Sequence, residues 1–176
     1  LTSAFDEAGL KYETHVMPSG EMSKSLAEYS AVIEEMAAFG FNRNSAVVSF
    51  GGGVAGDLAG FIASTYMRGI PVVHIPTTLL AQCDSSVGGK TALDISSAKN
   101  IIGTVYQPQL VVCDVSLLKT LPAEVRLDGM GEIFKYAVLR GEHILKYRND
   151  AEMIYNALKI KAEFISADEY DNSARR

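Results

Sequence analysis

The chain has 176 residues, 48% of them hydrophobic and 21% charged, and its 16 basic and 21 acidic side chains give a net charge of −5. This apolar fraction excludes a disordered chain, and the acidic balance excludes a module that binds nucleic acid mainly through phosphates. The length suits one domain, since a chain of about 150 residues buries roughly 68–70% of its unfolded surface.

The first forty residues contain signals for two helices and one strand. Residues 1–9 are typical of the end of a helix, with Gly9 as the residue that stops it. The alternating pattern of residues 11–17 predicts a strand, which a Pro-Ser-Gly turn ends. Over residues 25–39 the apolar side chains recur at helical spacing, and Gly40 follows as a stop signal.

Strands and helices then alternate along the chain. Apolar runs predict buried strands at residues 46–50, 71–75 and 110–113. A helix rich in small residues is predicted over residues 54–67, between the first two of these strands. Strands separated by helices favour a parallel sheet with crossover helices.

Beyond residue 121 the pattern becomes helical only. Helices are predicted over residues 122–139 and 150–167. The predicted fold class is therefore α/β: a Rossmann-like, parallel-sheet domain over residues 1–121, followed by the start of an all-helical domain over residues 122–176.

A glycine-rich loop joins the first apolar strand to its helix. Gly51, Gly53 and Gly56 match the spacing G-x-G-x-x-G, in which the backbone approaches a pyrophosphate and the helix N-terminus meets its charge. A tight turn without a ligand is the alternative, and the strand-to-helix context favours the ligand. An ordinary Rossmann unit has an acid about 20 residues further on, but residues 71–76 carry no carboxylate. Asp57 either caps the helix or accepts a hydrogen bond from a ligand hydroxyl.

Residues 84–91 end in Gly-Lys-Thr, as the phosphate-binding P-loop does. That pattern needs a glycine where Asp84 stands and a helix after Lys90, whereas residues 92–98 have the pattern of an irregular chain. We therefore reject a nucleotide triphosphatase at this segment.

Four polar side chains nevertheless gather there: Asp84, Lys90, Lys99 and Asn100. Two lysines near a concave site suit a phosphate or a carboxylate, and loops held by a rigid scaffold are frequent functional sites. A solvated, glycine-rich hairpin is the alternative without a ligand. We expect an anion-binding site.

The two cysteines, Cys83 and Cys113, are too few for a disulfide scaffold, which favours reduced thiols in the cytoplasm. No run reaches the ~20 apolar residues of a membrane span, and residues 1–9 lack the features of a signal peptide. We expect a cytoplasmic protein that binds neither a membrane nor nucleic acid.

A series of short blocks resembles the central part of the 3-dehydroquinate synthase family of sugar-phosphate cyclases. Each block alone is a weak signal, but the ordered set is specific and covers the chain from residue 18 onward. The blocks are residues 18–21 with Lys24, 51–57, 66–69, 76–82, 84–91, 99–100, 107–108, 119–122 and 129–136.

The resemblance implies a site for NAD. Glu21 and Lys24 resemble contacts to the NAD ribose, which would replace the missing Rossmann acid. The implied cofactor-binding residues are Ser19, Gly20, Glu21, Lys24, Gly52, Gly53, Val54, Gly56, Asp57, Thr77, Thr78, Lys90, Lys99, Leu117, Lys119 and Thr120.

The resemblance also implies five catalytic residues. Asp84, Lys90 and Asn100 would lie where nicotinamide and substrate meet, and Lys135 would face the substrate. Arg68 resembles a residue that reaches the substrate phosphate across the interface of a homodimer.

A divalent metal, zinc or cobalt, is implied as well. Glu132 resembles the first of three metal ligands, and none of His15, His74 and His143 matches the two histidines that complete the family's set. Those two histidines, and the first strands of the cofactor domain, are expected to lie outside this chain.

The implied activity is a phosphate-eliminating carbon–oxygen lyase of the shikimate pathway, which leads to chorismate and the aromatic amino acids. It converts 3-deoxy-D-arabino-heptulosonate 7-phosphate into 3-dehydroquinate and phosphate, with NAD carrying the redox chemistry. Lysines and an arginine suit such an anionic substrate.

The sequence leaves three alternatives to this activity. A 2-deoxy-scyllo-inosose or epi-valiolone synthase is a related cyclase, and residues 84–91 favour the dehydroquinate branch. A metal-dependent glycerol or alcohol dehydrogenase shares the triple-glycine turn, but a neutral polyol needs no anion site. A non-catalytic NAD-binding fragment gains weight if the chain ends at Arg176.

Overall fold

A three-stranded parallel sheet forms the centre of the molecule. The computed structural model describes residues 1–140, 146 and 149–172. Strands β1 (Val47–Gly51), β2 (Val72–Pro76) and β5 (Leu110–Val111) lie in the order β1-β2-β5, and all pairs are parallel. The α/β prediction and all three predicted strands are thereby confirmed.

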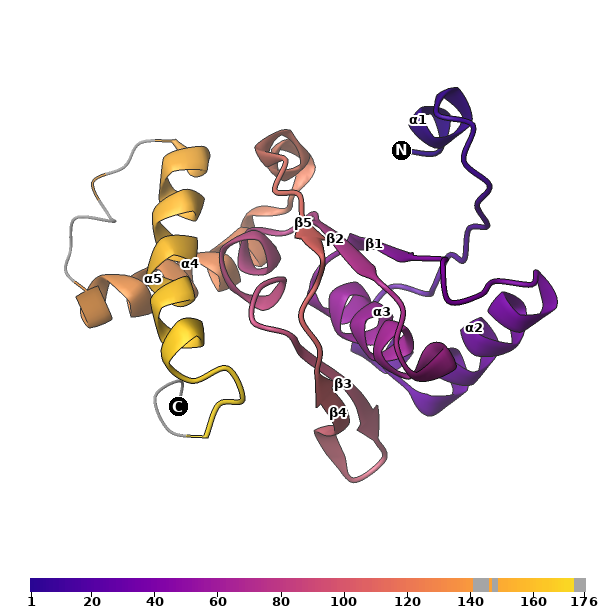
Figure 1. Cartoon of the computed structure of the whole chain (residues 1–176). Coiled ribbons are helices and arrows are strands. Elements are labelled where there is room, and N and C mark those ends of the chain that lie inside the picture. Colours follow the sequence, from indigo (N-terminus) through magenta and orange to yellow (C-terminus); the bar gives the residue numbers. More distant parts are fainter. Residues whose placement is uncertain (141–145, 147–148, 173–176) are drawn as a thin grey trace.

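Helix α3 (Gly53–Thr65) makes the crossover from β1 to β2, and α2 (Leu26–Ala38) packs beside it (Figure 1). Helix α2 begins and ends as the sequence predicts. The hydroxyl of Ser25 accepts from the Glu28 backbone N–H at 3.2 Å, and Gly40 has φ +76° after the last turn. Backbone bonds from Gly40 to Ala37 and from Phe41 to Met36 complete a Schellman motif.

A first hydrophobic cluster joins α2, α3 and the sheet. Its members are the buried residues Met36, Leu58, Phe61, Ile62, Ala63, Tyr66, Ile70, Val72 and Leu93. Burial of each large side chain of this kind contributes about 1.5–3 kcal/mol. Helix α3 contributes side chains to this cluster and begins at Gly53 of the glycine loop, so the packing of α3 fixes the position of that loop.

The chain between β2 and β5 forms an antiparallel hairpin and not the irregular segment predicted for residues 92–98. Strands β3 (Lys90–Ile95) and β4 (Ala98–Val105) pair with each other, and β3 packs against α3. The close contact depends on Gly60 of α3, where a Cβ would lie 2.4 Å from Cγ2 of Thr91. Four of the five pairs between β3 and β4 join residues that are nine or more positions apart, so the local pattern did not predict them.

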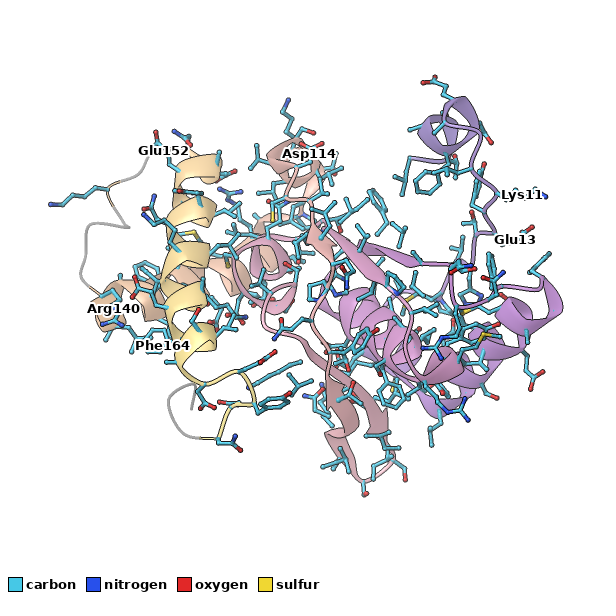
Figure 2. The ribbon with its side chains drawn as sticks, viewed as in Figure 1. Lys11, Glu13, Asp114, Arg140, Glu152 and Phe164 are labelled. Carbon is cyan, nitrogen blue, oxygen red and sulfur yellow. The ribbon has the colours of Figure 1, made fainter. Side chains whose placement is uncertain are left out.

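Two longer helices, α4 (Ala123–Arg140) and α5 (Asp150–Ala167), lie beyond the sheet (Figure 1). Their predicted positions are confirmed. The side chain of Asn149 caps α5 by accepting from the Glu152 N–H at 2.9 Å. Figure 2 shows Arg140 of α4 beside Phe164 of α5, with the guanidinium 5.0 Å from the ring centroid.

Short helical turns connect α4 and α5 to the sheet. The π-helical turn η3 (Ala81–Ser85) and the 3-10 turn η4 (Val115–Thr120) follow β2 and β5. Residues of both turns join the helices in a second hydrophobic cluster. Its buried members are Leu79, Cys83, Leu118, Ile133, Tyr136, Ala137, Met153, Ile154, Ala157 and Ile160.

Helix α1 (Thr2–Glu7) lies apart from the sheet (Figure 1). It ends before Gly9, which has φ +66° as predicted. The strand predicted at residues 11–17 is wrong: the segment that carries Lys11 and Glu13 (Figure 2) pairs with no strand of the described part of the chain. Among the described residues, no helix is long and apolar enough to cross a membrane.

Candidate functional site

The carboxyl ends of the three parallel strands meet at one edge of the sheet, where α/β proteins place their ligands. The glycine loop follows β1, Thr77 and Thr78 follow β2, and η4 follows β5. Buried Gln82 ties two of these connections together, since its side-chain amide donates to the carbonyls of Pro76 at 3.0 Å and Asp114 at 2.9 Å. The predicted cofactor residues of three separate blocks therefore share this edge.

The glycine loop is packed closely against its neighbours. Gly52 immediately precedes α3, and a Cβ there would lie 3.1 Å from Cγ2 of Thr78. A Cβ at Gly53 would lie 3.2 Å from the hydroxyl of Ser85, which has no hydrogen-bond partner among the described residues. A bare backbone at the N-terminus of a 13-residue helix, beside an unpaired hydroxyl, fits the pyrophosphate of a dinucleotide such as NAD.

Lys24 is the centre of a charged cluster beside this loop. Its side chain is 4% exposed, and its ammonium donates to Asp57 at 2.9 Å and to the Asn100 side-chain carbonyl at 2.5 Å. Glu21 and Asp94 lie 3.5 and 3.8 Å from the same nitrogen. Burial by itself lowers the pKa of Lys24, but the carboxylates around it, Asp57 first, hold that pKa above its usual value. Asp57 thus binds a lysine and does not cap α3.

Asp84 is the centre of a second cluster, on the other side of the cavity. It accepts from the Tyr136 hydroxyl at 2.5 Å and from the Lys161 ammonium at 2.9 Å, and Lys135 lies 3.9 Å away. Burial alone would raise the pKa of Asp84, but Lys161 and the Tyr136 hydroxyl hold it below its usual range. Asp84 is therefore an ionised carboxylate with a fixed orientation.

One cavity of about 640 Å³ lies between the two clusters. It brings together four of the predicted residues, Asp57, Asp84, Lys90 and Asn100, with Lys161 of α5. This is the size of a small-molecule site. A more apolar cavity of about 440 Å³ lies between residues 13–17, α2, β1 and α3, but carries none of the predicted residues.

Other predicted residues lie outside the cavity lining. Lys99 is 69% exposed and faces Glu21 at 3.5 Å. Arg68 is exposed after α3, with φ +71°. The remaining cofactor residues lie on the segment before α2 (Ser19, Gly20), at the start of α3 (Val54, Gly56) and in η4 (Leu117, Lys119, Thr120).

Sequence reasoning missed three residues that complete the two clusters. Lys161 and Tyr136 lie on helices whose spacing indicates only a packed face, and Asp94 lies in the segment predicted to be irregular. No local signal distinguishes Lys161 from the neighbouring exposed Lys159. Only the fold brings its ammonium to Asp84, 77 residues earlier in the chain.

The described residues do not form a metal centre by themselves. Glu132 pairs with Lys135 one turn along α4, and no group of three His, Cys, Asp or Glu side chains suited to a metal occurs in the described ranges. His143 lies outside those ranges. A catalytic zinc site needs three protein ligands, so Glu132 is one donor at most.

The two described histidines have opposite environments. His15 contacts Glu28 at 2.7 Å and Glu35 at 2.8 Å, and these bonds, Glu28 first, raise its pKa. His74 is buried in β2 with its Nδ1 unpaired in the described structure, and burial lowers its pKa.

We expect these histidines to give opposite pH dependences of stability. His74 is neutral in the folded chain, so its contribution to the free energy of unfolding is complete above its unfolded pKa of about 6.5. This contribution is lost as the pH falls, because the unfolded chain binds the proton more readily. His15 contributes below that pKa and loses its contribution as the pH rises through its raised folded value. Urea denaturation between about pH 5 and 9 measures the free energy of unfolding. As the pH falls, His74→Leu should lose less of this free energy than the unmodified chain does. His15→Gln should be less stable than the unmodified chain only at low pH. Parallel curves for both variants and the unmodified chain would contradict these assignments.

Comparison with known proteins agrees with this geometry. Residues 14–127 match the family described as 3-dehydroquinate synthase N-terminal. The chain is 43% identical to the 3-dehydroquinate synthase of Symbiobacterium thermophilum, over 98% of this chain and 52% of that protein. It thus spans about half the length of the curated relatives it matches.

Two solved cyclases have the same fold. A 2-deoxy-scyllo-inosose synthase complexed with carbaglucose-6-phosphate, NAD⁺ and Co²⁺ superposes with a TM-score of 0.86 at 29% identity, over 98% of this chain and 52% of its own. The 2-epi-5-epi-valiolone synthase of Streptomyces hygroscopicus, with NAD⁺ and Zn²⁺ bound, superposes with a TM-score of 0.85 at 27% identity, over 99% of this chain and 53% of its own. The match over residues 14–127 covers well over half of the described chain, and the chain therefore belongs to the 3-dehydroquinate synthase family.

Proposed function

We propose that this chain is the cofactor-binding part, with a share of the substrate site, of a cytoplasmic 3-dehydroquinate synthase of the shikimate pathway. The reaction converts 3-deoxy-D-arabino-heptulosonate 7-phosphate into 3-dehydroquinate and phosphate, a carbon–oxygen lyase reaction. The observation that carries the proposal is the single cavity in which Asp84, Lys90, Asn100 and Lys161 meet beside the Lys24–Asp57 pair.

NAD would occupy the edge of the sheet, and its chemistry is to accept a hydride and return it. Backbone amides at Gly52 and Gly53 would bind its pyrophosphate. Glu21, Lys24 and Asp57 form an already ordered set of donors and acceptors for ribose hydroxyls. NAD and metal in the two solved cyclases support this assignment.

The substrate would lie in the cavity, whose lining carries the two lysines that could meet an anion together with the carboxylates of Asp57 and Asp84. Lys90 and Lys161 line the cavity, and the Lys135 ammonium lies 3.9 Å from the carboxylate of Asp84. Lysines bind phosphate and carboxylate as point charges. Asp84, held ionised, can accept a hydrogen bond from a substrate hydroxyl. A dehydrogenase for a neutral polyol would not need this set.

Two further assignments concern groups beyond the described residues. Glu132 would supply one carboxylate of a zinc or cobalt site. Arg68, exposed and away from the cavity lining, would serve the site of a second copy in a homodimer. Helices α4 and α5 would begin a second domain, from residue 122.

The test joins this chain to the remaining part of the Symbiobacterium thermophilum enzyme and measures phosphate release from the heptulosonate phosphate. Release that requires NAD and a divalent metal is expected. NAD binding by calorimetry, made on the 176-residue chain alone, provides the second readout. NAD binding without release would indicate a non-catalytic NAD-binding fragment, and the absence of binding would overturn the proposal.

Lys90→Ala should lower the turnover of this hybrid by about 100-fold, the usual effect of removing one preorganised charge from a site. The Lys90 side chain is 58% exposed and pairs with Asp171, so the loss of stability should stay below about 1 kcal/mol. The matched control is Lys159→Ala, at an exposed lysine of α5. Normal turnover with a large loss of stability would show that Lys90 is structural.

A further inference from the structure

Asn100 has a backbone conformation that a β-strand does not normally provide. Its φ is +58°, in the left-handed region that is uncommon for residues other than glycine. It lies in an irregular part of the hairpin: between the pairs Leu93–Ile102 and Ile95–Ala98, β3 advances by two residues and β4 by four. Such bulges redirect a side chain, and strain of this kind persists only where neighbouring groups impose it.

Asp94 is the residue opposite this bulge, and its carboxylate binds the backbone of Asn100. It accepts from the Asn100 backbone N–H at 2.7 Å. This charge-assisted bond satisfies a donor that the bulge removes from the ladder between β3 and β4. With its backbone held, Asn100 turns its side-chain carbonyl to the Lys24 ammonium at 2.5 Å.

Asp94 also fastens the hairpin to the segment that carries Lys24. Its backbone N–H donates to the carbonyl of Lys24 at 2.8 Å, and it bridges Ser25 as an isolated β-pair. Its carboxylate lies 3.8 Å from the Lys24 ammonium. One aspartate thus holds two separate chain segments in register, through backbone and side chain together.

We infer that Asp94 is a positioning residue, which sets Asn100 against Lys24 and so shapes the boundary between the NAD and substrate sites. This inference rests on the proposed function, because the contact between Lys24 and Asn100 affects activity only if that site binds NAD and substrate. Asp94 does not line the cavity and would touch neither ligand.

The test uses three substitutions that separate geometry from charge. Asp94→Ala removes the acceptor, Asp94→Asn keeps a neutral acceptor in place, and Asp94→Glu keeps the charge but displaces it. Asn149→Ala is the control, because it removes a comparable side-chain-to-backbone bond at the start of α5, away from the site. Each variant of the 176-residue chain is examined for NAD affinity by calorimetry and for hydrogen exchange at the Asn100 amide.

We expect Asp94→Ala to weaken NAD binding about tenfold or more, as loss of a hydrogen bond to a charged group does, and to abolish protection of the Asn100 amide. Asp94→Asn should stay within about threefold of the unmodified affinity, and Asp94→Glu should fall about fivefold or more. If Asp94→Ala does not fold, the Asn and Glu variants decide. Asn149→Ala should lower stability alone.

Two results would overturn the inference: unchanged NAD affinity in Asp94→Ala, or an Asn variant as weak as the Ala variant beside a normal Glu variant. The second would make the charge near Lys24, and not the bond to Asn100, the cause. If the unmodified chain binds no NAD, the proposed function fails instead. Exchange at the Asn100 amide then decides separately whether Asp94 holds this backbone.

Discussion

Lys24→Met should lower the free energy of unfolding by about 3–5 kcal/mol, the usual cost of removing one partner from a buried ion pair. The lysine is 4% exposed and is the shared cation of Glu21, Asp57 and Asp94. Methionine keeps most of the side-chain volume, so the loss reports charge and not a cavity. Asp57 and Asp94 would then lose the cation that they share, whereas Glu21 would keep Lys99 at 3.5 Å. NAD binding should be lost because the ordered set of Glu21, Lys24 and Asp57 would no longer form.

Urea denaturation at neutral pH measures this loss. Lys11→Met is the matched control, because Lys11 is exposed on the segment after α1 (Figure 2) and should change stability by less than about 0.5 kcal/mol. Equal stability of the two variants would mean that water, and not Lys24, compensates the carboxylates.

Gly129→Ala should destabilise the chain by about 1–3 kcal/mol or more, because the added methyl group has no space. Its Cβ would lie 2.6 Å from both the Leu80 backbone nitrogen and Cγ of Leu79. A backbone atom cannot move aside as a flexible side chain does. Helix α4 would be pushed away from the turn that positions Asp84.

Gly131→Ala is the matched control, two residues along the same helix. A Cβ there meets nothing within 4 Å, so alanine should stabilise α4 by about 0.5–1 kcal/mol through its higher helix propensity. Thermal unfolding of the two variants should therefore shift in opposite directions. Similar shifts would contradict the close packing of α4 on residues 79–80.

The helices and the parallel strands could be predicted because their signals are local. Ser25 and Gly40 bound α2, and the apolar run at residues 71–75 forms most of the central strand of the sheet, in which alternate residues are buried. The hairpin of β3 and β4 could not be predicted from local signals, since its stability comes from pairs such as Lys90–Val105 that lie far apart in sequence. Residues 11–17 show the converse: alternation alone does not make a strand without a partner.

The sequence by itself determined the fold class, the family and the residue types of the site, because glycine spacing, helix caps and the ordered blocks are written along the chain. Only the tertiary structure decided which of these residues meet. Lys161 contacts Asp84, Lys24 contacts Asp57 and Asn100, and Asp94 accepts a hydrogen bond from the backbone N–H of Asn100. The lysine contacts link segments 33 to 77 residues apart, and the Asp94–Asn100 bond forms only within the irregular hairpin. Their energies depend on burial and on short distances between polar groups, which no local pattern encodes.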